Sequence, residues 1–235
     1  MQLNKSLYGL KQSPRCWNIV LNDYLLSIGF TRCDADNCIY VRNTDCGLFL
    51  IAVYVDDLIL SSSNSNQMTE VKDRLSSRFS MTDMGELHYC LGVSVEQDPS
   101  NNCMYLHQHQ YIRMMLEKYG LSDAKMFATP CDTNVKLTKN DGSNYDSVDI
   151  VQFQSIVGSL LYAAMATRID IAFAVSFLSK FCSCPNESHL TAAKRILKYL
   201  KYTMTLKLKF EKSGRGLECY SDADWAGDHD DRRST

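Results

Sequence analysis

The sequence has no long hydrophobic run and little proline. No stretch of its 235 residues approaches the roughly 20 consecutive apolar residues that span a bilayer, and its first residues lack the basic start and apolar core of a signal peptide. Prolines number four, and 45% of residues are hydrophobic against 22% charged, which argues against disorder. We therefore expect a globular intracellular protein, cytoplasmic or nuclear, without a membrane partner.

The ten cysteines do not form a zinc-binding pattern. None of them stands in a Cys-x-x-Cys pair with matching histidines, which is the usual signature of a structural zinc site. The closest two, Cys182 and Cys184, are separated by one residue, a spacing that suits neither zinc nor an easy disulfide. We expect reduced thiols with a structural role.

The charge balance gives no overall basic excess. A net charge of −2 argues mildly against a nucleic-acid partner, because phosphate binding depends on lysine and arginine. The distribution is uneven, however. Residues 191–215 hold eight basic side chains against Glu211 alone, a local charge of 8 − 1 = +7.

Apolar residues at helical spacing predict several amphipathic helices. The first follows Ser13 and Pro14 and ends at Gly29, as expected for a helix with proline in its first turn and a terminal glycine. A polar, turn-rich stretch at 133–149 is the best candidate for a linker. The helices are predicted at 13–28, 64–78, 112–119, 151–166, 169–181 and 188–202.

Three β-rich segments lie between the first two helices. Residues 38–42 and 48–54 are separated by a polar turn and predict an antiparallel hairpin. Residues 58–61 continue the pattern after two acidic residues, which predicts a second, tight hairpin with carboxylates at its tip. A further strand is predicted at 87–95, where apolar residues alternate strictly.

The acidic residues at that tip are Asp56 and Asp57. They are embedded between two apolar runs, and like charges in a buried strand repel each other unless a cation neutralises them. Carboxylate oxygens suit Mg²⁺, and two such ions can promote nucleotidyl transfer. The alternative is a solvated turn, but a chance pair of aspartates belongs in a polar loop. We interpret Asp56 and Asp57 as catalytic metal ligands.

The string SLYGLKQSPR at 6–15 closely resembles the segment that shapes the template and nucleotide site in copia-type reverse transcriptases. By this resemblance, Tyr8, Gly9, Lys11 and Arg15 are candidates for nucleotide or nucleic-acid contacts. The two basic side chains would contact phosphate, and the glycine would permit close approach of the backbone. The alternative is a helix N-terminus with ordinary surface charges.

Segments farther along the chain are similar to later parts of the same family. Residues 81–92 resemble the strand pair that grips the primer end, which would place Leu91 and Gly92 at the grip. Residues 119–125 and 129–130 resemble the thumb, and residues 157–163 and 167–175 resemble the connection region. The strings at 220–228 and 231–235 resemble the opening strand of the family's RNase H domain, which would make Asp222 its first metal ligand. A lone acidic loop is the alternative, but the neighbouring Trp-Ala-Gly favours the resemblance.

The resemblance implies an α+β fold that contains a partial reverse-transcriptase palm. The palm would have an antiparallel sheet and packed helices, followed by a helical thumb, an α/β connection region and the first strand of an RNase H-like domain. The corresponding domains are 1–97 for the palm with primer-grip-like strands, 98–145 for the thumb, 146–214 for the connection region and 215–235 for the truncated RNase H start.

The implied function is RNA-directed DNA synthesis by a longer copia-type Pol protein. Its cofactor would be Mg²⁺, and its partners an RNA or DNA template-primer and deoxynucleoside triphosphates. The palm strand that carries the family's other metal-binding aspartate would precede Met1, so we expect the isolated chain to be inactive. An unpaired sheet edge would favour self-association.

Two other functions remain open. The first is a noncatalytic nucleic-acid-binding remnant that uses Lys194, Arg195, Lys198 and Lys201 on one helix face. A solvated helix side, packed through Leu190 and the apolar residues that follow at helical spacing, is the better interpretation of that face. The second is a structural or regulatory protein that reuses the fold, since architecture alone does not determine function.

Overall fold

The structure is a computed structural model that describes residues 6–45, 47–132, 134–139, 148–212, 214, 216 and 218–222. The chain divides into two compact units, Met1–Leu87 (unit 1) and His88–Thr235 (unit 2), and each is described by itself. Both combine helices with an antiparallel sheet, so the predicted α+β class is confirmed. No helix in the described ranges is long and apolar enough to cross a membrane.

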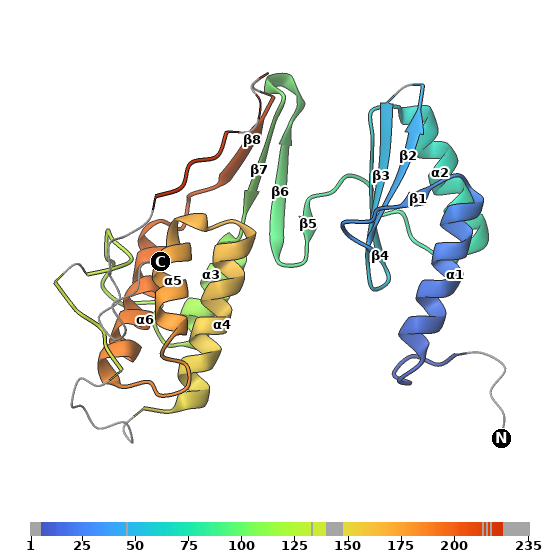
Figure 1. Cartoon of the computed structure of the whole chain (residues 1–235). Helices are drawn as coiled ribbons and strands as arrows, with labels where there is room; N and C mark the ends of the chain where they lie inside the picture. The colour runs from blue at the N-terminus through green and yellow to red at the C-terminus, as the bar shows by residue number, and fades with distance from the viewer. Residues whose placement is uncertain are drawn as a thin grey trace. The chain divides into compact units, whose positions relative to one another are not determined.

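Unit 1 is a four-stranded antiparallel sheet with two helices on one side (Figure 1). Its strands follow the order β1-β2-β3-β4, so every neighbour in the sheet is also a neighbour in sequence. Both predicted hairpins are therefore confirmed. The elements are α1 (Ser13–Ser27), β1 (Thr31–Arg32), β2 (Ile39–Thr44), β3 (Gly47–Tyr54), β4 (Asp57–Ser62) and α2 (Ser65–Arg78).

The core of unit 1 lies between one face of the sheet and both helices. Alternate residues of β3 point into it, among them Phe49 and Ile51, each with no exposed surface. The helices contribute one residue per turn, such as Leu21 and Leu25 from α1. The other side chains of β3 point to the opposite face, which neither α1 nor α2 covers (Figure 1).

Unit 2 joins a second antiparallel sheet, of order β5-β6-β7-β8, to a group of helices (Figure 1). Its core is larger than that of unit 1 and is formed mainly by α3, α4, α5 and α6. The elements are β5 (Tyr89–Cys90), β6 (Val93–Asp98), β7 (Cys103–His107), α3 (His109–Lys118), α4 (Ile150–Ala166), the 3-10 turn η3 (Ile169–Ile171), α5 (Ala172–Ser179), α6 (Glu187–Tyr202) and β8 (Leu208–Glu211), with a further 3-10 turn at Pro99–Asn101.

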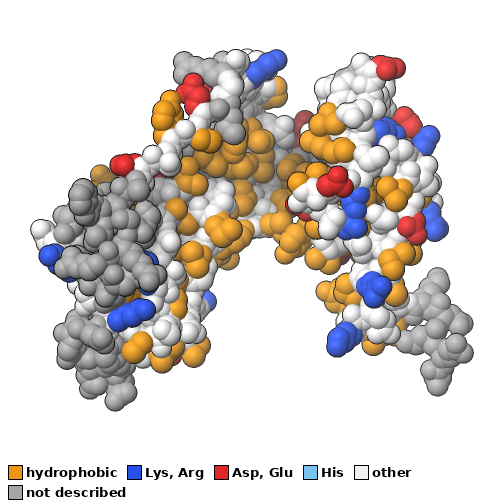
Figure 2. All heavy atoms as spheres, viewed as in Figure 1, with side chains coloured by type: hydrophobic (Ala, Val, Ile, Leu, Met, Phe, Trp, Pro, Cys, Tyr) orange, Lys and Arg blue, Asp and Glu red, His pale blue; other side chains and the backbone are white. Residues whose placement is uncertain are grey.

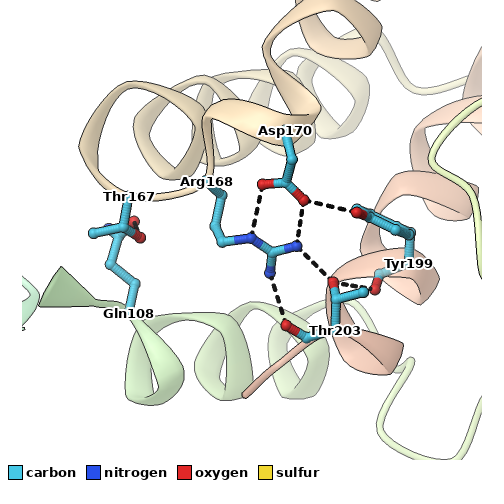
Figure 3. A network of polar contacts seen from close by, with 6 residues as sticks. All are labelled: Gln108, Thr167, Arg168, Asp170, Tyr199 and Thr203. Atoms are coloured by element: carbon cyan, nitrogen blue, oxygen red, sulfur yellow. Dashed lines mark hydrogen bonds and ion pairs between the residues drawn. The ribbon is translucent and has the colours of Figure 1, made fainter. Parts of the chain in front are cut away.

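The interior of unit 2 contains a buried arginine, Arg168, which is 2% exposed. Its guanidinium binds both carboxylate oxygens of Asp170, at 2.9 and 2.7 Å, and donates to the carbonyl and hydroxyl oxygens of Thr203 (Figure 3). The hydroxyl of Tyr199 donates to the same carboxylate at 2.8 Å. This network fastens the start of η3 to the end of α6.

Two predicted elements are wrong in detail. The strand predicted at 87–95 is broken at Leu91 and Gly92, which form a two-residue turn between β5 and β6. Alternation persists across the break, because a two-residue turn does not disturb a pattern of period two. The helix predicted at 169–181 begins with η3 and continues as α5. Strands β1, β7 and β8 were not predicted, and most of the predicted linker lies outside the described residues.

The four-part domain division stays a prediction. The boundary between the compact units falls after Leu87, ten residues before the end of the predicted palm. Within unit 2, β6, β7 and β8 pair in one sheet although they come from three of the four predicted domains. The segment expected to form a helical thumb thus contributes β7 as well as α3.

Candidate functional site

The two acidic residues lie at the turn of the β3–β4 hairpin, which we call the carboxylate hairpin. Tyr54 pairs with Asp57, so Val55 and Asp56 are the two central residues of the turn. Val55 has φ +56°, whereas Asp56 is not among the residues with positive φ. This combination corresponds to a type II′ turn, whose first central residue is usually glycine. A β-branched residue there is a backbone outlier, and such strain is concentrated at functional sites.

The carboxylates are exposed, not buried. Both Asp56 and Asp57 lie at the surface, so the expectation that they form a buried pair is wrong, and burial gives no reason for a neutralising cation. The apolar runs on either side misled the sequence argument, because the strands turn at the aspartates and carry them out of the core. Asp57 is opposite Tyr54 and shares its face of the sheet, which is the face without helices.

A tryptophan ties the tip of the carboxylate hairpin to helix α1. The indole Nε1 of Trp17 donates a hydrogen bond of 2.7 Å to the carbonyl oxygen of Val55. The ring of Trp17 packs edge-on against Phe79, with 5.3 Å between centroids. Helical spacing places Trp17 only among the apolar residues of α1; the signal for its second role is the indole N–H, a donor that needs a partner.

The nucleotide-site segment leads into α1 at its N-terminal end. Figure 2 shows basic side chains at that end, where Lys11 and Arg15 are exposed. Tyr8 is 99% exposed, and Gly9 has φ +89° with open space where a Cβ would stand. Because Trp17 is in the same helix, its bond to Val55 places this segment and the carboxylate hairpin at one end of unit 1 (Figure 1).

The donor set at the tip fits a magnesium ion that is bound mostly by water and substrate. Mg²⁺ commonly takes one or two carboxylates from the protein and its other oxygens from water and phosphate. Asp56 and Asp57 can supply those two carboxylates. No group of three or more metal-ligating side chains occurs in the part of the chain that the structure describes, so the site has no complete set of protein ligands there.

The predicted primer-grip residues form the tight turn between β5 and β6 of unit 2. Leu91 has φ +51° and Gly92 +81°, the pattern of a type I′ turn. The hydroxyl of Tyr162, in α4, donates to the carbonyl of Leu91. A Cβ on Gly92 would lie 3.0 Å from that hydroxyl oxygen, so glycine allows the turn to pack on the helix. The predicted role of this turn as a primer grip stays a prediction.

The basic face of α6 is largely engaged within unit 2. Arg195 forms an ion pair of 3.0 Å with Asp132 and also binds Thr129. Lys201 donates to the carbonyl oxygen of Ala124, and Arg195 and Lys198 lie over the ring of Phe127. These contacts hold the segment after α3 against α6. The apolar side of α6 is buried as predicted, through Leu190, Ala193, Leu197 and Leu200.

Two histidines of unit 2 resemble a metal site but cannot chelate one ion. The rings of His107 and His109 are stacked, with 3.8 Å between centroids and 24° between planes. A metal bound in the plane of one imidazole would lie well above the plane of the other, outside the direction of its lone pair. The ring of His107 instead binds Glu96 at 2.9 Å. Burial, followed by the charges of His107 and Lys207, lowers the pKa of His109.

Asp222, the predicted RNase H ligand, is exposed and lies in a stretch without regular secondary structure. Its predicted neighbours from 223 onward lie outside the described residues. Its assignment as a metal ligand stays a prediction.

Comparison with known proteins identifies similar sequences over the whole chain. Residues 1–133 match the family described as reverse transcriptase (RNA-dependent DNA polymerase). The chain is 40% identical over 235 residues to the retrovirus-related Pol polyprotein from transposon RE1 of Arabidopsis thaliana, which covers all of this chain and 16% of that protein. It is 35% identical over 239 residues to the corresponding polyprotein from transposon TNT 1-94 of Nicotiana tabacum, and the match covers 100% of this chain and 18% of that protein.

A yeast relative has a length closer to that of this chain. The putative transposon Ty5-1 protein of Saccharomyces cerevisiae is 35% identical over 235 residues, covering all of this chain and 75% of the yeast protein. The chain spans less than a fifth of the length of the two plant polyproteins. No solved structure matches the chain.

Proposed function

Because the chain belongs to the reverse transcriptase family of copia-type retrotransposon Pol polyproteins, we propose that its carboxylate hairpin holds divalent ions during RNA-directed DNA synthesis. The observation that carries the proposal is the geometry of the tip. Two adjacent carboxylates stand in solvent on a strained, tight turn that is tied to the nucleotide-site segment. A solvated turn without a function has no need of valine at positive φ.

The residues of the tip have separate tasks in this proposal. Asp56 and Asp57 bind and orient the ions, while the open face beside Tyr54 leaves room for the end of a primer. When bound, Mg²⁺ would polarise the attacking hydroxyl and neutralise phosphate charge. Lys11 and Arg15 contact the phosphates of the template-primer or of the incoming deoxynucleoside triphosphate.

Metal binding by the purified chain tests the proposal without relying on activity. Mn²⁺ replaces Mg²⁺ and broadens NMR signals of nearby amides, so the wild type should lose the signals of the hairpin tip first. The double variant Asp56→Asn/Asp57→Asn should bind at least about tenfold more weakly, since both protein ligands are lost. Unchanged broadening at the tip in this variant would rule out the proposed site.

A matched control comes from the same unit. Asp34 and Asp36 are a second pair of closely spaced, exposed aspartates, in the loop between β1 and β2. Asp34→Asn/Asp36→Asn removes the same charge and should leave Mn²⁺ binding at the tip unchanged. In a Pol protein that contains this sequence, Asp56→Asn should lower primer extension about 10²-fold or more, because metal ligation contributes several kcal/mol to the transition state.

A further inference from the structure

The hydrogen bond from Trp17 acts on the one peptide group that determines the form of the turn. In a two-residue turn, rotation of the central peptide interconverts types II′ and I′. The central peptide here joins Val55 to Asp56, and its carbonyl oxygen is the atom that accepts from the indole of Trp17, at 2.7 Å. We infer that Trp17 is a positioning residue that locks the carboxylate hairpin in its type II′ form. This inference rests on the proposed function.

Without that bond the turn has a second form within reach. Rotation of the central peptide would leave Val55 at positive φ and move Asp56 from negative to positive φ. Aspartate tolerates this left-handed region better than most residues do. Such a flip would turn over the carbonyl of Val55 and the N–H of Asp56, and it would change the rotamers open to Asp56, because rotamer preference depends on φ. The carboxylate of Asp56 keeps one set of rotamers beside Asp57 while the carbonyl of Val55 is held.

Trp17 is itself held in an aromatic cluster with Phe79 and Tyr24. Phe79, at the C-terminal end of α2, packs edge-on against its ring and against the ring of Tyr24, each with 5.3 Å between centroids. The hydroxyl of Tyr24 donates to the carbonyl of Arg74 at 2.7 Å. The three rings link α1 to α2, so the position of the indole N–H is determined by the core of unit 1 and not by the turn.

The position of Trp17 in α1 connects the turn to the nucleotide-site segment. Arg15 lies two residues before it in the same helix, and Ser13 anchors the preceding loop through a hydrogen bond to the carbonyl of Leu7. The helix is rigid over this distance. The side chains that contact phosphate and the side chains that bind metal are thereby held at fixed positions relative to each other. Polymerisation requires this, because the nucleotide and its metal ions must be aligned for the reaction.

The test uses Trp17→Phe, which keeps the ring and removes the N–H donor. Amide protons of Val55 and Asp56 are close in a type I′ turn and distant in type II′, so an NOE between them should be absent in the wild type and present in the variant. Mn²⁺ affinity at the tip should fall about tenfold, as for other groups that orient metal ligands. Wild-type affinity in Trp17→Phe would overturn the inference, with or without the new NOE.

The control is Tyr24→Phe, which removes the hydroxyl donor of another ring in the same aromatic cluster and keeps all three rings and the indole donor. It should retain wild-type Mn²⁺ affinity and show no NOE between Val55 and Asp56. Equal weakening by Tyr24→Phe and Trp17→Phe would show that the indole donor has no special role and would reject the inference. The variant Asp56→Asn/Asp57→Asn distinguishes failure of the proposed function from failure of this inference. If that variant binds Mn²⁺ with wild-type affinity, the proposed function fails. If it binds weakly and Trp17→Phe binds with wild-type affinity, only the positioning role of Trp17 fails.

Discussion

The β3–β4 turn of unit 1 and the β5–β6 turn of unit 2 share a construction and differ in what they display. In each, the first residue of the turn has positive φ, and its carbonyl accepts a hydrogen bond from an aromatic side chain of a helix: Trp17 for Val55 and Tyr162 for Leu91. The turn of unit 1 presents two exposed carboxylates. The turn of unit 2 has glycine at its second position and packs against α4. A held turn can therefore serve either to display charge or to dock.

The interiors of the two units also differ in how many polar side chains they bury. Every buried side chain described in unit 1 is counted as hydrophobic, whereas unit 2 buries six polar or charged side chains among its described residues. Unit 1 thus keeps its charges for the surface, where a cation can reach them. Unit 2 uses polar groups such as Arg168 to join its helices internally.

The largest expected loss of stability comes from disrupting the polar network around Arg168 in unit 2. Arg168→Ala removes a buried guanidinium together with its hydrogen bonds to Asp170 and Thr203, and should lower the free energy of unfolding of unit 2 by about 3 kcal/mol. Unit 1 should keep its stability, as measured by amide hydrogen exchange resolved by residue. The exposed Arg113→Ala is the control and should have little effect. A loss below about 1 kcal/mol for Arg168→Ala would show that the network is dispensable.

A smaller effect is expected where the second turn docks. Gly92→Ala places a Cβ at φ +81° and 3.0 Å from the hydroxyl of Tyr162, and should destabilise unit 2 by about 2 kcal/mol in urea unfolding. Gly120→Ala is matched for positive φ but has open space around the added atom. It should cost less, about 1 kcal/mol. Equal costs would mean that contact with Tyr162 contributes nothing.

The sheet edges extend the comparison to self-association. The backbone hydrogen bonds from β4 to β3 are made by Asp57, Ile59 and Ser61. The backbone N–H and C=O groups of the residues between them therefore point away from the sheet, at its open edge. Strand β4 carries no lysine or proline, while the edge strand β8 carries Lys209. We propose that unit 1 pairs with a second copy through β4.

Ser61→Lys tests this pairing at an exposed position of the edge. It should weaken self-association about tenfold, or about 1.4 kcal/mol, in sedimentation over a concentration series. Ser80→Lys, also exposed but outside the sheet, should leave association unchanged. A wild-type chain that stays monomeric at every concentration would contradict the proposal.

The smallest expected effect is the loss of stability of unit 2 at acidic pH. Burial raises the pKa of Asp170, but the hydrogen bonds from Arg168 and Tyr199 outweigh it and hold that pKa below its ordinary value. A lowered pKa in the folded state stabilises the protein above the unfolded pKa of about 3.9 and is lost as pH falls through the folded pKa. Unit 2 should therefore lose stability below about pH 4, and Asp170→Asn should flatten that loss. Asp34→Asn, in unit 1, should not change it.

Much of the fold followed from local patterns. Helical spacing predicted the six α-helices near their observed positions, and the polar break at 43–47 and the aspartates at 56–57 located both hairpins of unit 1. Strands β7 and β8 were missed because they are short and pair across a long stretch of chain. The basic residues of α6 were open to two interpretations, since only tertiary contacts reveal that Arg195 and Lys201 have partners within the unit.

The sequence alone determined that two aspartates stand at the tip of a tight hairpin, because residue spacing sets where strands turn. Only the tertiary structure decided that they are exposed and that Val55 is held at positive φ. It also decided that the indole of Trp17 donates a hydrogen bond to the carbonyl oxygen of Val55. Exposure and side-chain hydrogen bonds depend on which distant residues the fold brings together. A local pattern carries no record of those partners.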